Sequence, residues 1–343
     1  MITNKQTLSV WKVREDKFPQ KQKIEIQLKF LLHYAILAPS GHNTQPWKFY
    51  IEKNKLQVWA DLDQSRKEVD PENRELYISV GCAITNLETA AKRFNLVWEE
   101  NWWPVASKPN LVLEMEFKDV RRDYGEIEPL FEAITKRSTS RNKFDTSKEV
   151  DINFHKDENK WLTANGVKIS WVKNVAEKEK VAQLVSSAQK IWFRSKKLTE
   201  ELEFWLKKDI TDLGLKKNGV VSLTNFSMNL KQFMGTEFKS IDDRAERDRK
   251  WLLEAPLVGV LWTKNDNLRS WVEAGRKYEY LCLWATSQNL QTGYFNSVAQ
   301  LPKKRSELAL ILGERMWPQL LFRMGYGKRG RMSPRKNVGA VLM

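Results

Sequence analysis

The chain has few cysteines and histidines and no long apolar run. Cys82 and Cys282 are the only 2 cysteines among 343 residues. Both lie in apolar helical patterns, which argues against a disulfide framework or a cysteine-ligated metal. The 3 histidines form no pair at helical spacing, so we predict no metal site. No apolar run approaches the roughly 18 residues that span a bilayer. The first twenty residues lack the apolar core of a signal peptide, so we expect a cytoplasmic protein without a membrane partner.

Positive charge is in excess. Lysine and arginine total 58 against 43 acidic residues, which gives a net charge of +15. These basic residues are scattered along the chain and match no nucleic-acid-binding motif, so we expect no nucleic-acid partner. A charge-driven nucleic-acid-binding module is the alternative, and its affinity would fall steeply with salt.

Two segments of the chain resemble each other. Residues 75–94 and 271–289 both have helical periodicity, and five identities recur at a constant offset of 194 positions. The matched residues are Gly81, Leu87, Ala91, Asn95 and Leu96 with Gly275, Leu281, Ala285, Asn289 and Leu290. Each helix follows an apolar strand-like run and precedes another. We therefore predict an α+β fold of two repeats, each with a small, mostly antiparallel sheet and a long central helix, packed as an intramolecular pseudo-dimer.

The repeats set the predicted domains. Residues 1–128 form the first repeat and residues 129–343 the second, with a lid-like insertion at about 196–250 that has no counterpart in the first. The insertion is rich in phenylalanine and methionine, at Phe226, Met228, Phe233, Met234 and Phe238. A segment of this composition packs against another part of the protein. It serves either as surface cover or as a functional lid.

Two motifs carry chemical information. The first begins at Pro39 and contains Ser40, Gly41 and Asn43. Their backbone and side-chain groups could form hydrogen bonds with the polar edge of a planar heterocycle. The alternative is an ordinary loop between a helix and a strand. In the second, Arg137, Thr139 and Arg141 alternate along the chain. In an extended segment they would share one face and suit a phosphate dianion, whereas the alternative is a solvated basic loop.

Together these residues resemble the nitroreductase family of FMN-dependent enzymes. The resemblance rests on P-S-x-x-N-x-Q-P-W at residues 39–47, on R-x-[S/T]-x-R at residues 137–141, and on a Gly-Tyr pair followed by a basic tail. The fused double unit, with its Asp-Pro-x-x-Arg-Glu lead-in at residues 70–75, more closely resembles the Acg subgroup of that family.

The resemblance implies a single FMN site at the interface of the repeats, because each motif occurs once. The phosphate would be held by Arg137, Thr139, Arg141 and Arg335, with Lys250 or Lys336. The isoalloxazine would be approached by Pro39, Ser40, Gly41 and Asn43 from the first repeat. On its other side would lie the loop 294–297, with Asn296 and Ser297.

Two functions follow from this resemblance. The first is an oxidoreductase that moves two electrons from NADPH or NADH through FMN to a nitroaromatic, a quinone or a similar small-molecule acceptor. The cofactor carries that chemistry, so no catalytic side chain is named. The alternative is an FMN-sequestering protein whose lid closes the site and allows little or no turnover. The pseudo-dimer would be monomeric or would dimerise further.

Overall fold

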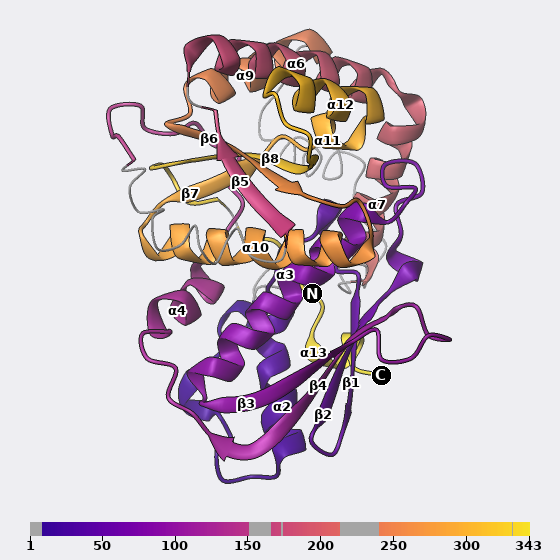
Figure 1. The fold of residues 1–343 in the computed structure, drawn as a ribbon, viewed down its shortest axis with the longest axis vertical. Coiled ribbons are helices and arrows are strands. Elements are labelled where there is room, and N and C mark those ends of the chain that lie inside the picture. The colour runs from indigo at the N-terminus through magenta and orange to yellow at the C-terminus, as the bar shows by residue number, and fades with distance from the viewer. Residues whose placement is uncertain (1–8, 151–165, 173, 213–239, 331) are drawn as a thin grey trace.

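The molecule consists of two α+β halves stacked along its long axis (Figure 1). The computed structural model describes residues 9–150, 166–172, 174–212, 240–330 and 332–343. Each half contains one four-stranded antiparallel sheet, and a long helix from each half lies between the two sheets. The predicted α+β class and the paired repeats are confirmed.

The first half has the strand order β1-β2-β4-β3. Burial alternates along β2, where every second side chain is buried, because one face of the sheet packs on the core and the other faces solvent. The elements are α2 (Ile24–Ala35), β1 (Trp47–Glu52), β2 (Lys55–Ala60), α3 (Arg74–Arg93), β3 (Leu96–Trp102) and β4 (Leu111–Arg121).

The second half repeats this order as β5-β6-β8-β7. Helices α6, α9 and α12 lie on the outer side of its sheet (Figure 1). The elements are α4 (Glu128–Lys136), β5 (Val167–Trp171), α6 (Val175–Arg194), α7 (Lys196–Asp212), α9 (Ile241–Leu253), β6 (Leu257–Thr263), α10 (Leu268–Ser287), β7 (Gln291–Tyr294), α11 (Ser297–Gln300), α12 (Pro302–Ile311), β8 (Trp317–Gly325) and α13 (Val338–Val341). The elements that were not predicted from the sequence are β3 in the first half and α4, β5, α6, α9, β7, α11, α12 and α13 in this list.

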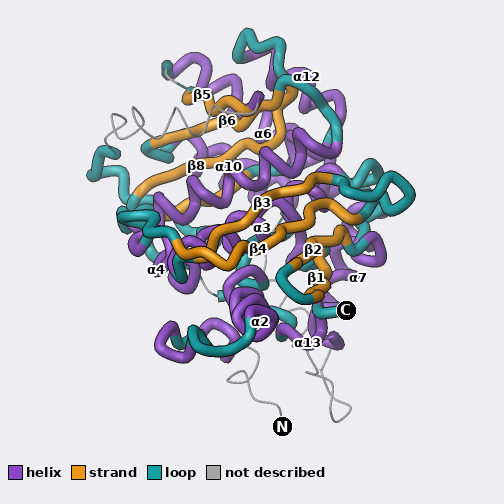
Figure 2. The backbone as a smooth tube through the Cα atoms, turned by 60° about the horizontal axis from the view of Figure 1, so that its bottom comes forward, coloured by secondary structure: helices purple, strands orange, loops and turns teal. Residues whose placement is uncertain are grey.

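Helices α3 and α10 form the junction between the halves (Figures 1 and 2). Both have twenty residues, and their two ends match at the offset of 194 seen in the sequence. They cross at Gly81 and Gly275, where a β-carbon on Gly81 would overlap the carbonyl oxygen of Val272 and one on Gly275 that of Ile78. The absence of side chains there lets the two backbones touch.

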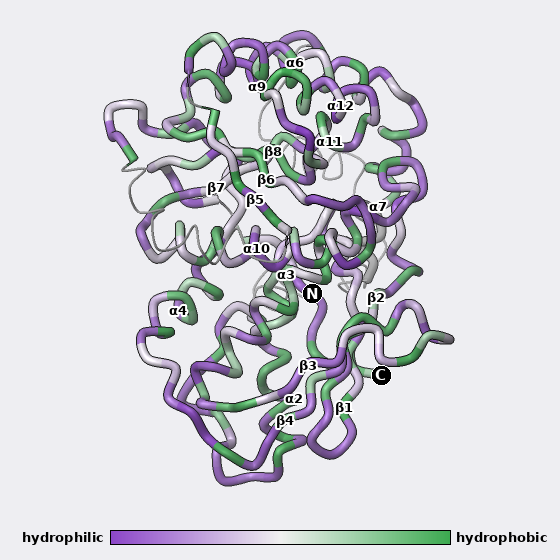
Figure 3. Tube along the Cα trace, viewed as in Figure 1, coloured by the Kyte–Doolittle hydropathy of each residue, from purple (hydrophilic) through white to green (hydrophobic). Residues whose placement is uncertain are grey.

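One hydrophobic core extends through both halves and includes residues of α3, α10 and both sheets. A second core lies under α6 in the second half. Hydrophobic residues recur along the packed elements, whereas the outer loops are hydrophilic (Figure 3). None of the helices in the described ranges is both long and apolar enough to cross a membrane.

The insertion expected at about 196–250 is not one unit. Helix α7 passes beside the short helix Gly41–Asn43, whereas α9 packs along α6. Glu201 of α7 accepts hydrogen bonds from the backbone N–H groups of Glu68 and Val69, which ties α7 to the first half. The phenylalanines and methionines at 226–238 lie outside the described residues.

Candidate functional site

A pocket opens between the halves, and both supply its walls. The first half contributes residues 39–42 and one side of α3, and the second contributes residues 140–141, the loop 294–297 and parts of α6, α7, α9 and β8. The space among these residues, including the part open to solvent, is about 1230 Å³. A concave site at the interface of two units is a common place for a cofactor.

The loop from the first half is held in an unusual backbone conformation. His42 has φ of 49°, in the left-handed region. A β-carbon on Gly41 would come within 2.5 Å of the Arg66 guanidinium, so only glycine allows this approach. The Ser40 hydroxyl accepts a hydrogen bond from the backbone N–H of Gln45 at 3.0 Å.

His42 is a neutral polar group in the pocket wall. Burial, with a further contribution from the positive charge of Arg66, lowers the pKa of His42 to about 3. Its Nδ1 atom is buried and has no hydrogen-bond partner within the described part of the chain. A neutral imidazole in this position can accept or donate one hydrogen bond to a bound molecule.

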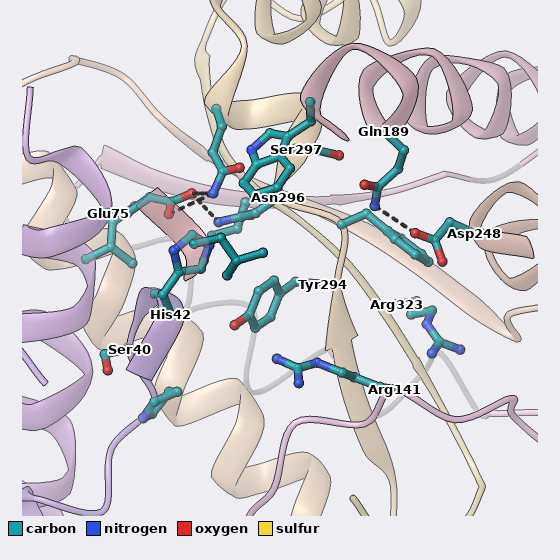
Figure 4. Close-up of a pocket in the computed structure, with 18 of the residues that line it drawn as sticks. Ser40, His42, Glu75, Arg141, Gln189, Asp248, Tyr294, Asn296, Ser297 and Arg323 are labelled. Atoms are coloured by element: carbon teal, nitrogen blue, oxygen red, sulfur yellow. Dashed lines mark hydrogen bonds between the residues drawn. The ribbon is translucent and has the colours of Figure 1, made fainter. Parts of the chain in front are cut away.

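Glu75 at the start of α3 joins the two halves across the pocket (Figure 4). Its carboxylate accepts hydrogen bonds from Arg66 Nη2 at 2.6 Å, from Asn296 Nδ2 at 2.6 Å and from Gln300 Nε2 at 3.1 Å. Burial alone would raise the pKa of Glu75, but Arg66 and Arg74 together hold it below its usual range. The residue belongs to the Asp-Pro-x-x-Arg-Glu segment, so a sequence signal existed although no role was given to it.

Arginines gather at the opposite end of the pocket from Glu75. Arg141 and Arg323 are seen there in Figure 4, together with the hydrogen-bonded pair Gln189 and Asp248. Two further arginines from α9, at positions 244 and 247, also line this end. The pocket therefore has one end built around a compensated carboxylate and one end rich in positive charge.

The loop after β7 supplies two buried polar atoms that have no hydrogen-bond partner in the described part of the chain. Asn296 Oδ1 and Ser297 Oγ are buried and have no hydrogen-bond partner among the described residues. Tyr294, just before them, lies beside the Arg141 guanidinium (Figure 4). Buried polar atoms without partners are uncommon, and at a pocket wall they indicate places where a ligand can bond.

The structure brings together about half of the residues expected at the site. Six line the pocket, namely Pro39, Ser40, Gly41, Arg141, Asn296 and Ser297. Five do not, namely Asn43, Arg137, Thr139, Lys250 and Arg335. The two groups differ in what they contact.

The structure places Arg137 and Arg141, whose alternation in the sequence predicts a shared face, beside different groups, Glu279 and Tyr294. Arg137 is buried, and its Nε lies 3.3 Å from Oε1 of the fully buried Glu279 on α10. Burial raises the pKa of Glu279 to about 7, although Arg137 opposes this. The backbone two residues after Arg137 pairs with β7 through a bridge from Thr139 to Thr292. This bridge fixes the segment against the sheet of its own half, the second one. The carboxylate of Glu279 thus draws Arg137 toward the helix junction and away from Arg141.

Asn43 and Arg335 bond to each other behind the pocket. Arg335 Nη1 donates to Asn43 Oδ1 at 2.6 Å and its Nη2 donates to the carbonyl of Leu37 at 3.3 Å. The backbone N–H of Lys336 donates to Gln45 Oε1 at 2.7 Å. These bonds fasten the C-terminal segment to the loop that forms the pocket wall. Lys250 instead lies on the solvent side of α9, with 66% of its side chain exposed and Glu254 at 3.9 Å.

Comparisons with known proteins found relatives of low sequence identity that cover most of the chain. No family model matches the chain. The "Putative NAD(P)H nitroreductase acg" of Mycobacterium tuberculosis is 22% identical over 298 residues, which are 87% of this chain and 88% of that protein. The "Putative NAD(P)H nitroreductase Rv3131" of the same organism is 21% identical over 87% of this chain and 85% of its own. The chain is similar to both of these proteins over most of its length.

Solved structures also align with parts of the chain. The FMN-dependent nitroreductase NfnB of Mycobacterium smegmatis, in complex with NADPH, covers 62% of the chain and 96% of its own, with 15% identity and a TM-score of 0.39. A BluB-like flavoprotein of Clostridium difficile covers 61% of the chain and 94% of its own, with 16% identity and a TM-score of 0.37. The assignment of two repeats rests on the chain's own topology and helix register.

Proposed function

We propose that the protein is an FMN-dependent NAD(P)H oxidoreductase of nitroreductase type. One FMN would bind in the pocket between the halves, and a nitroaromatic, quinone or similar acceptor would take two electrons there. The observation that carries this proposal is that two distant sequence motifs, at 39–42 and at 140–141, meet across one pocket. The names of the Acg relatives support the reaction type.

The residues present suit a flavin nucleotide. Its heterocycle needs hydrogen bonds along a polar edge. The pocket wall holds buried polar atoms on His42, Asn296 and Ser297 that have no hydrogen-bond partner among the described residues. Its phosphate needs cations, and Arg141 stands in the wall on the basic side. When bound, FMN supplies the hydride-accepting centre, while these side chains hold and orient it and limit the access of water.

A sequestering role is the second candidate, and the position of α7 favours it. Leu202 of α7 and Trp192 of α6 line the pocket, and the bonds of Glu201 hold α7 against the first half. Helix α7 in this position would hinder the entry of small acceptors into the pocket. It would also keep the nicotinamide of NAD(P)H away from FMN. In that case the protein would hold FMN with little or no turnover.

Anaerobic absorption spectra of the purified protein test both roles. Flavin bands that bleach with NADPH or NADH are expected for the oxidoreductase. Flavin bands that bleach only with dithionite would favour sequestration. An absence of flavin bands, even after incubation with FMN and gel filtration, would contradict the proposed cofactor.

Arg141→Ala tests the placement of the cofactor. Loss of a charge-assisted contact to phosphate should weaken FMN binding about tenfold or more, measured by quenching of flavin fluorescence on titration. Lys143→Ala is the matched control, because Lys143 lies two residues away, is 57% exposed and pairs with Glu254 outside the pocket. Equal affinity of both variants for FMN would argue against the assignment of Arg141.

A further inference from the structure

The carboxylate of Glu75 fixes how the side-chain amide of Asn296 is turned. An ionised carboxylate only accepts hydrogen bonds, whereas a side-chain amide has a donating NH2 group at one end and an accepting oxygen at the other. Asn296 Nδ2 lies 2.6 Å from Glu75 Oε1, and Gln300 Nε2 lies 3.1 Å from both oxygens of the same carboxylate (Figure 4). Both amides therefore direct their NH2 groups at Glu75.

Glu75 keeps its negative charge because two arginines lie beside it. Arg66 Nη2 donates to Oε2 at 2.6 Å, and Arg74 Nη2 lies 3.6 Å from Oε1. Burial acts to raise the pKa of Glu75, but the two arginines hold it below its usual range. The carboxylate thus stays an acceptor, and the orientation of the Asn296 amide does not change with protonation.

The other end of the Asn296 amide has no partner. Oδ1 is buried and accepts no hydrogen bond from the described part of the chain, although Asn296 lines the pocket. Turning the amide over would not help, because the oxygen would then face the carboxylate. A buried acceptor without a donor costs free energy, and a ligand N–H in the pocket would remove that cost.

The next residue extends this pattern. Ser297 also lines the pocket, and its buried Oγ has no hydrogen-bond partner among the described residues. A hydroxyl can donate as well as accept, so the two side chains together offer an acceptor and a donor. Such a pair is complementary to a planar CO–NH unit, which has one accepting oxygen and one donating N–H.

The molecules of the proposed reaction contain CO–NH units of this kind. The isoalloxazine of FMN has its ring N–H at N3, between two carbonyl groups. The nicotinamide of NAD(P)H has a carboxamide. A nitro group and a quinone carbonyl only accept hydrogen bonds, so the orientation of Asn296 disfavours them at this place in the wall.

We propose that Glu75 is a positioning residue that presents Asn296 Oδ1 as a hydrogen-bond acceptor to the amide N–H of a bound heteroaromatic ring. This inference rests on the proposed oxidoreductase function and gives the rule by which the site recognises its ligand. The N–H belongs either to N3 of the flavin or to the carboxamide of the nicotinamide.

Two pairs of ligands that differ at this N–H provide the test. The first pair is FMN and 3-methyl-FMN, in which a methyl group replaces the N3 hydrogen. The second pair is NADP in its oxidised form and the 3-acetylpyridine analogue, in which a methyl group replaces the carboxamide NH2. Fluorescence titration of FMN-free protein measures the flavin pair. Isothermal titration of oxidised, FMN-loaded protein measures the nicotinamide pair, and no turnover takes place in either experiment.

The native protein should bind the ligand with the N–H at least about tenfold more tightly than its partner in one of the two pairs. A preference within the flavin pair assigns the N–H to N3, and one within the nicotinamide pair assigns it to the carboxamide. Glu75→Gln and Asn296→Ala should each reduce that preference to about twofold or less, because only the ligand with the N–H loses affinity.

The two variants support each other. Glu75→Gln replaces the carboxylate with an amide that donates or accepts, so Asn296 is no longer fixed, and the space available to the ligand stays the same. It therefore separates the lost hydrogen bond from any extra room for a methyl group in Asn296→Ala. Asn296→Ala leaves Glu75 bonded to Arg66 and Gln300, so it tests the acceptor even if Glu75→Gln does not fold.

Asn101→Ala is the matched control, because Asn101 is exposed on β3 and lies outside the pocket. It should keep the native preference. Equal weakening of both members of a pair in the Glu75 and Asn296 variants would show a purely structural role and overturn the inference. A native protein without preference in either pair would overturn it as well. If the native protein takes up no flavin, the proposed function fails by itself, and the nicotinamide pair still tests Asn296 in the FMN-free protein.

Discussion

The two halves share one topology but contribute different parts of the pocket. Their sheets have equivalent strand orders, and α3 and α10 begin and end at matched positions. The first half supplies a loop with unusual backbone geometry and the carboxylate of Glu75, whereas the second supplies most of the positive charge and the polar loop after β7. The comparison shows that a repeated scaffold fixes positions and leaves the residues at those positions free to diverge.

Matched positions on the central helices show this divergence. Glu75 corresponds to Arg269 at the offset of 194, and Thr85 corresponds to Glu279. Glu75 is buried in a network that joins the halves, while Arg269 lies 3.6 Å from the ring centroid of Trp102 near the surface. The two glycines at the crossing are kept in both halves, because the close approach of the backbones requires both.

Gly275→Ala should break the pairing of the halves and have the largest effect. The added methyl group would meet the backbone carbonyl of Ile78, which cannot rotate away, so α3 and α10 would have to separate along their length. We expect a loss of about 5 kcal/mol in the free energy of unfolding, measured by urea denaturation, or a failure to fold.

Gly339→Ala is the control for that substitution. Gly339 is exposed, and a methyl group there would meet only the Asn337 side chain at 3.3 Å. Its free energy of unfolding should stay within about 0.5 kcal/mol of the native value. A stable, native-like Gly275→Ala protein would refute the tight crossing.

Glu75→Ala and Arg269→Ala compare matched positions with different burial. Removing Glu75 leaves Arg66, 2% exposed, without the carboxylate it bonds at 2.6 Å, which should cost about 3 to 5 kcal/mol. Removing Arg269 loses a cation–π contact with Trp102 and an ion pair with Glu273, which keeps its second partner Arg276, so the loss should be about 1 to 2 kcal/mol. Urea denaturation of both variants measures the difference, and equal losses would show that the pocket network adds nothing to stability.

Glu279→Gln tests a smaller, pH-dependent difference. The pKa of Glu279 in the folded protein is about 7, above its ordinary value, so the unfolded chain releases this proton first as pH rises. Glu279 thus contributes stability below about pH 4.5 that is lost as pH rises through 7, up to roughly 3 kcal/mol. The native protein should lose more stability between pH 4.5 and 8 than the glutamine variant does.

The control for the pH series is Glu128→Gln, which changes a carboxylate that is 65% exposed. This variant should follow the native dependence of the free energy of unfolding on pH. If Glu279→Gln also follows it, the buried carboxylate does not titrate in this range.

Periodicity predicted the long elements, and motifs predicted part of the pocket. The helices at 75–94 and 271–289 were predicted because their apolar spacing is strong. Strand β7 was missed because four residues, one of them glycine, carry too little pattern, and β3 was missed because its middle residues are exposed and acidic. The arginines of α9 and β8 and the bonds of Glu75 depend on contacts between distant segments, which local spacing does not encode.

We propose that the first repeat ends at residue 128 and the second begins at residue 129, but the C-terminal segment returns across that boundary. Leu342 bridges to Phe49 of β1, and the N–H of Met343 donates to the carbonyl of Phe49 at 2.8 Å. Domains generally begin to fold in the order of their synthesis. Here the half that the ribosome makes first completes its sheet edge and its pocket loop only after the C-terminal segment has emerged. The first half therefore depends on the C-terminal segment for contacts at its sheet edge, and a nascent chain that stalls in the second half would leave the first one open at that edge.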